Sequence, residues 1–349
     1  MTNTLADASP ATKPGLPAVG SAAAGPWRTG LRKLWRDRTA MAAALVLLVV
    51  VAACACASLY AEHISGTDPF RSNLDGQIVV EGQAFEIMAA DTGDMGLGVT
   101  PIGPTWREQY FFGADSQGRD VAARILYGGR NSLLIAFASA ALCLVLAAVV
   151  GTVAGFAGGV TDTILARLLD VLWAFPVYLL AISLSIVLIS RGLQIGPFNI
   201  PSNSLLLPVM IIGIVYVPYV ARPIRGQVMS LVRSDFVLAA RCIGVPTARI
   251  LLLDILPNVT TTIIVFTPIM MSLNMLTESA LSFLSIGVQP PGASWGTIIQ
   301  DGQGLLYTRP MVAIASGVAI ITTVLALNFL GDGVRDAFDP RAKLRVGAG

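Results

Sequence analysis

Charged residues are absent from seven long stretches of this chain, and these stretches organise the whole sequence. Each stretch has 20 or more residues without Asp, Glu, Lys or Arg: 39–61, 131–161, 171–190, 192–221, 255–277, 279–300 and 310–331. A helix that crosses a bilayer needs about 20 predominantly apolar residues. Six stretches meet this condition, whereas the Pro-, Gly- and Ser-containing segments 289–292 and 294–296 predict that 279–300 is a loop. The pattern therefore predicts an all-α integral membrane protein with six transmembrane helices.

Lysine and arginine are unevenly distributed between the two sides that six spans define. With Met1 in the cytoplasm, the cytoplasmic segments 1–38, 158–170, 222–254 and 332–349 hold 16 of the 23 basic residues. Basic residues favour the cytoplasmic side of short loops. We therefore expect a multi-pass protein of the cytoplasmic (inner) cell membrane with both termini inside.

This topology divides the chain into five parts. They are a flexible cytoplasmic N-terminal tail (1–38), a first transmembrane helix (39–61), a long extracytoplasmic loop (62–130), a five-helix transmembrane core (131–331) with a cytoplasmic loop at 222–257, and a cytoplasmic C-terminal tail (332–349). The N-terminal prediction rests on the Ala, Pro, Gly and Thr content of the first 27 residues. The apolar run after the tail starts too late for a signal peptide and is long enough to span.

Composition excludes several other classes of protein. Hydrophobic residues make up 54% of the chain, charged residues 13%, and the mean hydropathy is +0.72, which is far from a soluble domain. The formal charge of +2 is small, so nucleic acid is not an expected partner. The four cysteines form no C-x-x-C pair and His63 is the single histidine, so no metal site is predicted.

The sequence also lacks a motif for nucleotide hydrolysis. A P-loop needs Gly-Lys-Ser/Thr, and none of Lys13, Lys33 and Lys343 follows a glycine. The segment 292–296 fits the Gly-x-Ser-x-Gly pattern of hydrolases, but that pattern requires a strand before it and a helix after it, so we expect an outer-loop turn. The chain is thus not expected to be an enzyme, and energy for any transport must come from a partner or from an ion gradient.

The most distinctive connection between two predicted spans runs over Asp235–Asn258 and reads DFVLAARCIGVPTARILLLDILPN. The pattern predicts a short helix over Asp235–Arg241, a turn at Gly244, and a second helix over Thr247–Leu256 that ends at Pro257. A protein that merely spans lipid would need only a plain connection here.

The small residues Ala239 and Ala240 leave one face of this segment open to close approach, while Arg241 and Arg249 keep it at the water boundary. The Ala-Ala pair, the glycine four residues on and the Ile-Leu-Pro-Asn close resemble the cytoplasmic "EAA" loop of binding-protein-dependent ABC importer permeases, which docks onto an ATPase subunit. The resemblance implies an ATPase-coupling role for Asp235, Ala239, Ala240, Arg241, Gly244, Val245, Pro246, Arg249, Leu256 and Pro257.

Further segments over roughly residues 110–341 resemble the dipeptide/oligopeptide/nickel permease family. They read FGADSQGRDV (112–121), LARLLDVLWAFP (165–176), ALSFLSIGVQPP (280–291) and NFLGDGVRDAFDPR (328–341). The chain is similar to the second of the two permeases in peptide and nickel importers. It departs from the family at Leu238, where a Glu is frequent, and at Leu253-Asp254, where Arg-His is common.

The resemblance implies a type I ABC importer permease fold that works as a heterodimer with a second permease. It also implies two cytoplasmic ATPase subunits and an extracytoplasmic substrate-binding protein as partners. ATP and magnesium would be bound by the ATPases, with no cofactor in this chain. The expected cargo is a peptide, and nickel or another solute is the alternative.

Two other classes remain as alternatives at this point. An ion-gradient-driven secondary transporter predicts internal repeats and charges at the membrane midplane. The sequence shows no clear repeat and few charges within the spans. A membrane-embedded enzyme would require a catalytic cluster, which the sequence lacks.

Glu278 is an acid at the outer end of a predicted span, and such residues are candidates for function. It would either line the pathway and meet a peptide amino terminus, or pair with an outer-loop arginine such as Arg119 or Arg130. Asn274, one turn earlier, is a candidate for the same pathway or helix-pairing role.

Two pairs of residues carry structural predictions. Arg167 and Asp170, three residues apart on a helix, predict a local ion pair. Gly151 and Gly155 have the small-residue spacing that allows two membrane helices to pack closely.

Overall fold

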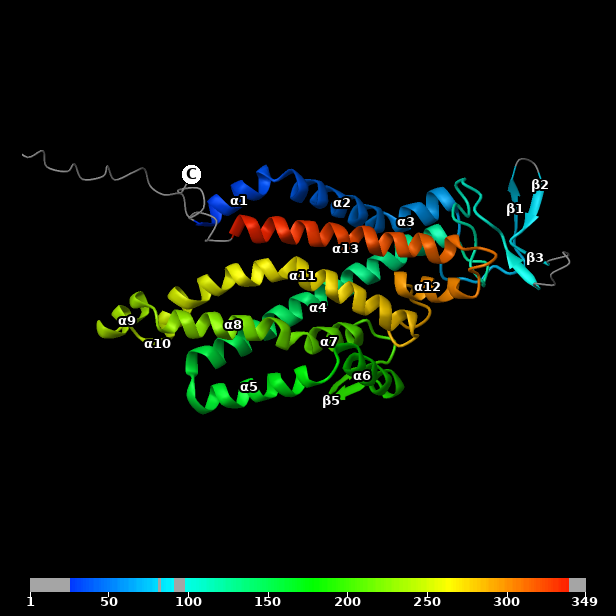
Figure 1. Cartoon of the computed structure of the whole chain (residues 1–349). Coiled ribbons are helices and arrows are strands. Elements are labelled where there is room, and N and C mark those ends of the chain that lie inside the picture. The colour runs from blue at the N-terminus through cyan, green and yellow to red at the C-terminus, as the bar shows by residue number, and fades with distance from the viewer. Residues whose placement is uncertain (1–25, 81–82, 91–97, 339–349) are drawn as a thin grey trace, which may run out of the picture.

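The structure is a computed structural model that describes residues 26–80, 83–90 and 98–338, and it is an elongated bundle of helices (Figure 1). The helices are α1 (Pro26–Arg36), α2 (Arg38–Ala55), α3 (Ala57–Leu59), the π-helix η1 (Tyr60–Ser65), α4 (Val121–Ala157), α5 (Gly159–Ala174), α6 (Val177–Arg191), α7 (Leu206–Val215), α8 (Val217–Val232), α9 (Asp235–Cys242), α10 (Thr247–Arg249), the π-helix η2 (Ile250–Ile255), α11 (Leu256–Phe283), α12 (Trp295–Gln303) and α13 (Met311–Phe338).

Short strands within the described residues pair into antiparallel hairpins. They are β1 (Gln77–Val80) with β2 (Gln83–Glu86), β3 (Met88–Ala90) with β4 (Val99–Pro101), and β5 (Leu193–Ile195) with β6 (Phe198–Ile200). The first two hairpins lie beyond one end of the bundle, next to α12, and we call this the hairpin end (Figure 1). The other end carries α1, α9 and α10, and we call it the loop end.

Several helices are long and apolar enough to cross a membrane. Among the described residues they are α2, α4, the run Thr247–Phe283 and α13. The pairs α5–α6 and α7–α8 pass the same test together but are bent by 89° and 44°. If each bent pair is one span, the number of spans is six, which is the number that the sequence predicts.

The second span begins at Val121, earlier than the predicted start at 131. Asp120 caps this helix, because its carboxylate accepts hydrogen bonds from the backbone N–H groups of Ala122 (2.9 Å) and Ala123 (3.3 Å). Arg130 bounds the charge-free stretch, and the helix extends past it to include Arg124, whose guanidinium is buried and paired with acidic side chains. A helix can contain an arginine when the charge is paired. A prediction based only on the absence of charged residues therefore starts this helix too late.

The predicted third span, 171–190, is wrong in shape. Pro176 disfavours helical geometry at Phe175, which is extended at φ −89° and ψ 137°, so α5 and α6 are separate helices. The start of the predicted span 192–221 is also wrong, because Leu193–Ile200 forms the β5–β6 hairpin. The helix pair that follows, α7–α8, continues to Val232, beyond Arg222, the charge at which the predicted span ended.

The prediction of a flexible N-terminal tail over 1–38 is wrong for Pro26–Arg36, which forms α1. Proline is favoured in the first turn of a helix, and α13 provides a surface on which α1 packs. Residues 1–25 and 339–349 lie outside the described residues. The last span is longer than predicted, since α13 continues to Phe338.

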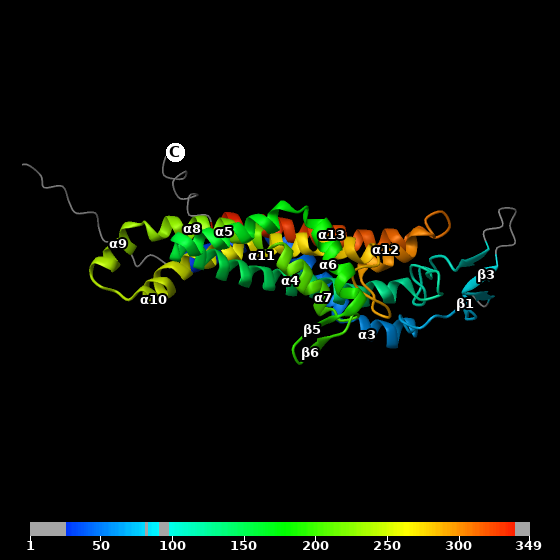
Figure 2. The same ribbon diagram turned by 90° about the horizontal axis from the view of Figure 1, so that it is seen from below.

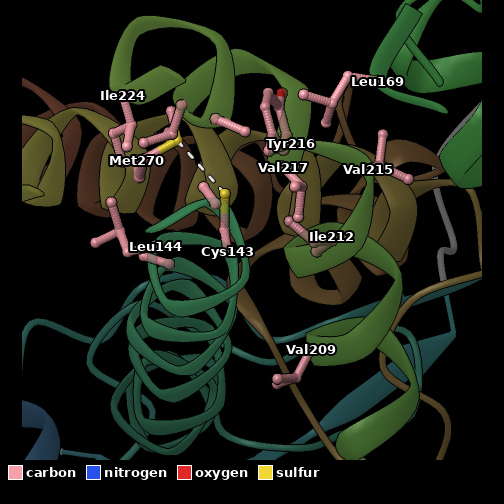
Figure 3. Packing of buried hydrophobic residues seen from close by; sticks show 14 of the residues in the cluster. Cys143, Leu144, Leu169, Val209, Ile212, Val215, Tyr216, Val217, Ile224 and Met270 are labelled. Carbon is pink, nitrogen blue, oxygen red and sulfur yellow. Dashed lines mark hydrogen bonds between the residues drawn. The ribbon is translucent and has the colours of Figure 1, made fainter. Parts of the chain in front are cut away.

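The helix α4 lies at the centre of the bundle and packs against α2, α7, α8 and α11. Close packing with α8 depends on Gly151 and Gly155, as predicted, because a Cβ at either position would lie 2.7 Å from a backbone oxygen of α8. Figure 3 shows the core beside this contact, where Cys143 of α4 points at Met270 of α11. The two sulfur atoms are 4.0 Å apart.

Candidate functional site

The segment Asp235–Asn258, which we call the projecting loop, extends beyond the rest of the bundle in both views (Figures 1 and 2). Its first helix, α9, ends at Cys242, and Gly244 follows at φ +80°. The N–H of Val245 donates to Ala240 O and that of Gly244 to Arg241 O, each over 3.0 Å. This hydrogen-bond pair with a left-handed glycine is a Schellman cap, which ends the helix and reverses the chain. The predicted first helix and the turn at Gly244 are therefore confirmed.

The second half of the loop differs from the prediction. The helix that begins at Thr247 does not end at Pro257, because α10, η2 and α11 form one run to Phe283. Pro257 lies in the first turn of α11, directly after the wide turns of η2. Proline is tolerated at such a position because its missing N–H is not required there. The loop is thus continuous with a membrane-crossing helix.

The inner side of the projecting loop is anchored in the bundle. Val237 of α9 and the η2 residues Ile250 and Ile255 are buried in the main hydrophobic core. Gln227 of α8 donates from Nε2 to Asn258 O (3.1 Å), and its Oε1 accepts from Thr262 Oγ1 (2.5 Å). These contacts attach both limbs of the loop to the helices that continue through the core.

The outer side of α9 presents an exposed apolar patch, which we call the notch because the small Ala239 lies between two large side chains. Phe236 and Ile243, seven residues apart on one helix face, are both exposed, and Ile243 is 81% exposed. The small side chain of Ala239 is also exposed and lies on the same face between them. Arg241 and Arg249, elsewhere on the projecting loop, are exposed and have no acidic partner in the part of the chain that the structure describes. An exposed apolar surface on a projecting segment that also carries exposed arginines is typical of a protein contact.

The predicted coupling residues are thereby brought together at one end of the molecule. Asp235, Ala239, Arg241, Pro246, Arg249 and Pro257 are exposed, and Ala240, Val245 and Leu256 are half-buried. Leu238, where the family often has Glu, is exposed on a different face of α9 from the notch. The departure from the family at Leu238 therefore alters a face of α9 that does not carry the notch, and the notch itself is unchanged.

Ion pairs join α5 to α8 near the loop end. Arg225 holds Asp162 through two contacts of 2.5 and 2.7 Å, and Arg222 contacts Asp170 at 2.7 Å. The predicted pair of Arg167 with Asp170 is present at 3.7 Å. Asp170 is therefore shared between its own helix and α8, a partner that the local sequence pattern could not indicate.

A second cluster of charges lies at the hairpin end, in the motif 112–121. Arg119 and Arg124 each contact Asp115 and Asp301 at 2.8 to 3.3 Å, so α4 and the loop before it are tied to α12. Asp115 also accepts from the N–H of Gln117 (2.9 Å), which closes the tight turn of the motif. The motif therefore has a structural explanation, and Asp301 is a member of the cluster that sequence analysis missed.

Burial dominates the electrostatics of this cluster. It raises the pKa of Asp301 above the ordinary value, and Arg124 and Arg119 offset part of the rise. Burial likewise raises the pKa of Asp120, opposed by the N–H groups that its carboxylate accepts. Asp120 is buried and Asp301 is partly exposed, and both carboxylates are held by a structural network.

Glu278 is fully buried and hydrogen-bonds to Ser282 Oγ (2.7 Å). The hypothesis that it pairs with Arg119 or Arg130 is wrong: Arg119 binds Asp115 and Asp301, and Arg130 donates to the carbonyl oxygens of Cys54 (2.7 Å) and Ala55 (2.6 Å). In this conformation, neighbouring serines are the hydrogen-bond partners of the Glu278 carboxyl.

Asn274 contributes to helix pairing. It is buried, and its amide hydrogen-bonds to Ser139 Oγ of α4 over 2.9 Å. The bond persists if the amide is rotated to exchange its O and N atoms, which also brings contacts to Met270 O and Ala140 N. Asn274 thus joins α11 to α4.

The motif 280–291 and the segment 292–296 that follows it lead into α12. Ser294 caps this helix by accepting from Thr297 N (3.3 Å), and Trp295 donates from Nε1 to Ile125 O (2.9 Å). The expected outer-loop turn is therefore the start of a short buried helix. Ser294 serves as a cap, and the described residues place no histidine beside it.

Comparison with known proteins gives this arrangement a family. Residues 147–344 match the family described as "Binding-protein-dependent transport system inner membrane component". The oligopeptide transport system permease protein of Haemophilus influenzae is 35% identical over 238 residues, which cover 68% of this chain and 72% of that protein. The chain belongs to this family.

Other similarities agree with this assignment. The dipeptide transport system permease protein of Alkalihalophilus pseudofirmus is 35% identical over 235 residues, 67% of this chain and 73% of that protein. The inward-facing MetNI methionine ABC transporter aligns with a TM-score of 0.50 and 17% identity, over 61% of this chain and 95% of that chain. The fold is that of a type I permease. The chain is a multi-pass membrane permease of the ABC importer class, and its family consists of transport subunits rather than enzymes.

Proposed function

We propose that this chain is one of two permease subunits of an importer that carries peptides into the cell with energy from ATP. The relatives are named for oligopeptide and dipeptide transport, which supports a peptide as the cargo. In this proposal, ATP and magnesium bind to two partner ATPase subunits, and a binding protein delivers the peptide from outside.

The observation that carries the proposal is the notch on α9. It consists of Phe236, Ala239 and Ile243 on α9, a helix that projects beyond the bundle (Figure 1) and whose inner residue Val237 is buried. A rigid apolar surface of this kind is suited to dock on a cytoplasmic ATPase. The loop end would then be cytoplasmic, an orientation supported by the excess of basic residues in the segments assigned to that side.

The loop would act as a lever on the membrane helices. It continues into α11 without a break, and Gln227 attaches its base to α8. The ion pairs Arg225–Asp162 and Arg222–Asp170 extend this connection to α5. ATP binding moves such a lever only if the ATPases contact the loop differently in their two states.

A second permease would complete the pathway. The helices α5 and α6 expose many large apolar side chains, which require a cover of lipid or protein: Val160, Ile164, Leu168, Val171, Trp173, Tyr178, Leu179, Ile186 and Val187. The outer loop, with its hairpins beyond the bundle, would contact the binding protein.

Uptake by proteoliposomes tests the proposal. The complex of this chain with its partner permease, ATPases and binding protein is reconstituted, and entry of labelled dipeptide, oligopeptide and nickel is measured. We expect peptide entry that requires ATP and the binding protein and that persists when ionophores remove ion gradients.

Each alternative makes a different prediction in the same assay. ATP-dependent entry of nickel without peptide would replace the cargo and leave the ABC mechanism intact. Peptide entry that stops with the ionophore and continues without ATP would favour a secondary transporter and contradict the proposal.

A further inference from the structure

The helix α1 carries four basic side chains and no acidic one. They are Arg28, Arg32, Lys33 and Arg36, within the sequence PWRTGLRKLWR. None of the four has an ion-pair partner in the part of the chain that the structure describes. The nearest carboxylate in sequence, Asp37, instead caps α2 by accepting from the N–H groups of Thr39 (2.9 Å) and Ala40 (3.3 Å).

The position of α1 is fixed by contacts on its opposite face. A Cβ at Gly30 of α1 would lie 2.8 Å from the ring of Phe338, and one at Gly333 of α13 would lie 3.5 Å from the Leu34 side chain of α1. Helix α1 therefore sits tightly on the end of α13. Since a single residue separates it from α2, it lies where that membrane-crossing helix begins, at the loop end (Figure 1).

Apolar side chains lie between the packed face and the basic face. Leu31 and Trp35, four residues apart, are 53% and 67% exposed. With Arg28, Thr29 and Arg32 they line a pocket of about 630 Å³. An open hollow with an apolar side and two guanidinium groups has the chemistry of a lipid site, because guanidinium binds phosphate well and the apolar side accepts acyl chains.

We propose that α1 lies in the membrane surface and binds anionic phospholipid through this pocket. Leu31 and Trp35 enter the boundary between head groups and acyl chains, and Arg28 and Arg32 hold the lipid phosphate. The occupant follows from charge complementarity and from continuity with α2: an uncompensated basic face at the mouth of a membrane-crossing helix faces head groups. The inference goes beyond transport and does not depend on which leaflet is involved.

Quenching of a probe on α1 by brominated lipids tests the proposal. Leu31→Cys in an otherwise cysteine-free full-length chain is labelled with bimane and reconstituted in nanodiscs of phosphatidylcholine with phosphatidylglycerol. Bromine is carried by one lipid or the other. We expect stronger quenching when phosphatidylglycerol carries the bromine.

Variants show whether the two arginines cause this preference. In the double variant Arg28→Gln with Arg32→Gln, the two brominated lipids should quench the probe equally. The double variant Arg28→Lys with Arg32→Lys should retain part of the preference for phosphatidylglycerol. Arg191→Gln with Arg233→Gln removes the same charge from two other exposed sites and should leave it unchanged. Equal loss in this control would mean that only total charge matters, which overturns the proposal.

Two further outcomes contradict the lipid assignment. Absence of quenching by either brominated lipid would place α1 away from the membrane. A preference that inorganic phosphate removes, while sodium chloride at the same ionic strength does not, would assign the pocket to a soluble phosphate compound.

Discussion

At the scale of single residues, Arg124 carries a deeply buried charge that depends on its acidic partners. Its guanidinium is almost completely buried, and it is held by Asp115 at 3.3 Å and Asp301 at 2.8 Å. A buried charge that loses a partner is much more costly than an exposed one. The cluster therefore governs the junction between the outer loop, α4 and α12.

We expect Asp301→Asn to destabilise the protein by about 1–3 kcal/mol, because it leaves Arg124 with one carboxylate less and Asp301 is itself partly exposed. The same change at the exposed Asp170 should cost only about 0–1 kcal/mol. Denaturant titration in detergent micelles measures both. Equal effects would mean that the cluster at the hairpin end is no more important than a surface pair.

Sequence analysis found one side of this cluster and missed the other. The motif around Asp115 and Arg119 is visible because its turn residues are contiguous. Asp301 lies 3.0 Å from Arg119 but far away in the chain, so local spacing gives no sign of the contact. For the same reason the two arginine partners suggested for Glu278 were wrong.

At the scale of elements, the projecting loop shows which features local chemistry determines. The glycine turn, the helix before it and the small-residue face followed from residue types in the sequence. The continuation through Pro257 did not, because a proline marks either the end of one helix or the first turn of the next. Only the packing of η2 distinguishes these two cases.

A substitution at Gly244 tests the turn without creating a steric clash with neighbouring residues. A Cβ there would meet nothing within 4 Å, so a substitution changes backbone energy and not packing. Gly244→Val should cost about 1–2 kcal/mol at φ +80° and tilt α9, abolishing ATP-driven uptake while membrane insertion is retained. Gly244→Asn should keep most of the uptake, because asparagine tolerates this conformation. Normal uptake by the valine variant would remove the coupling role of the turn.

At the scale of the whole molecule, the charge-free stretches predicted the membrane class, and the predicted six spans are reached if each bent helix pair is one span. They did not predict the bends, because an apolar composition is the same for a straight helix and for a bent or broken one. The β5–β6 hairpin and the break at Pro176 lie inside such runs. The helix α1 was missed because its basic residues exclude it from the charge-free stretches. The face of α1 that packs against α13 is identified only from the structure.

ATP turnover of reconstituted protein tests the central claim most directly, namely that this permease uses a partner's ATPase through the projecting loop. Purified alone, the chain should show no turnover, since its sequence lacks Gly-Lys-Ser/Thr. The complex with a second permease and ATPases should show turnover that rises with loaded binding protein. Ile243→Asp should abolish this rise, whereas Ile243→Leu should retain it. Turnover by the isolated chain, or an unchanged rise with Ile243→Asp, would contradict the account.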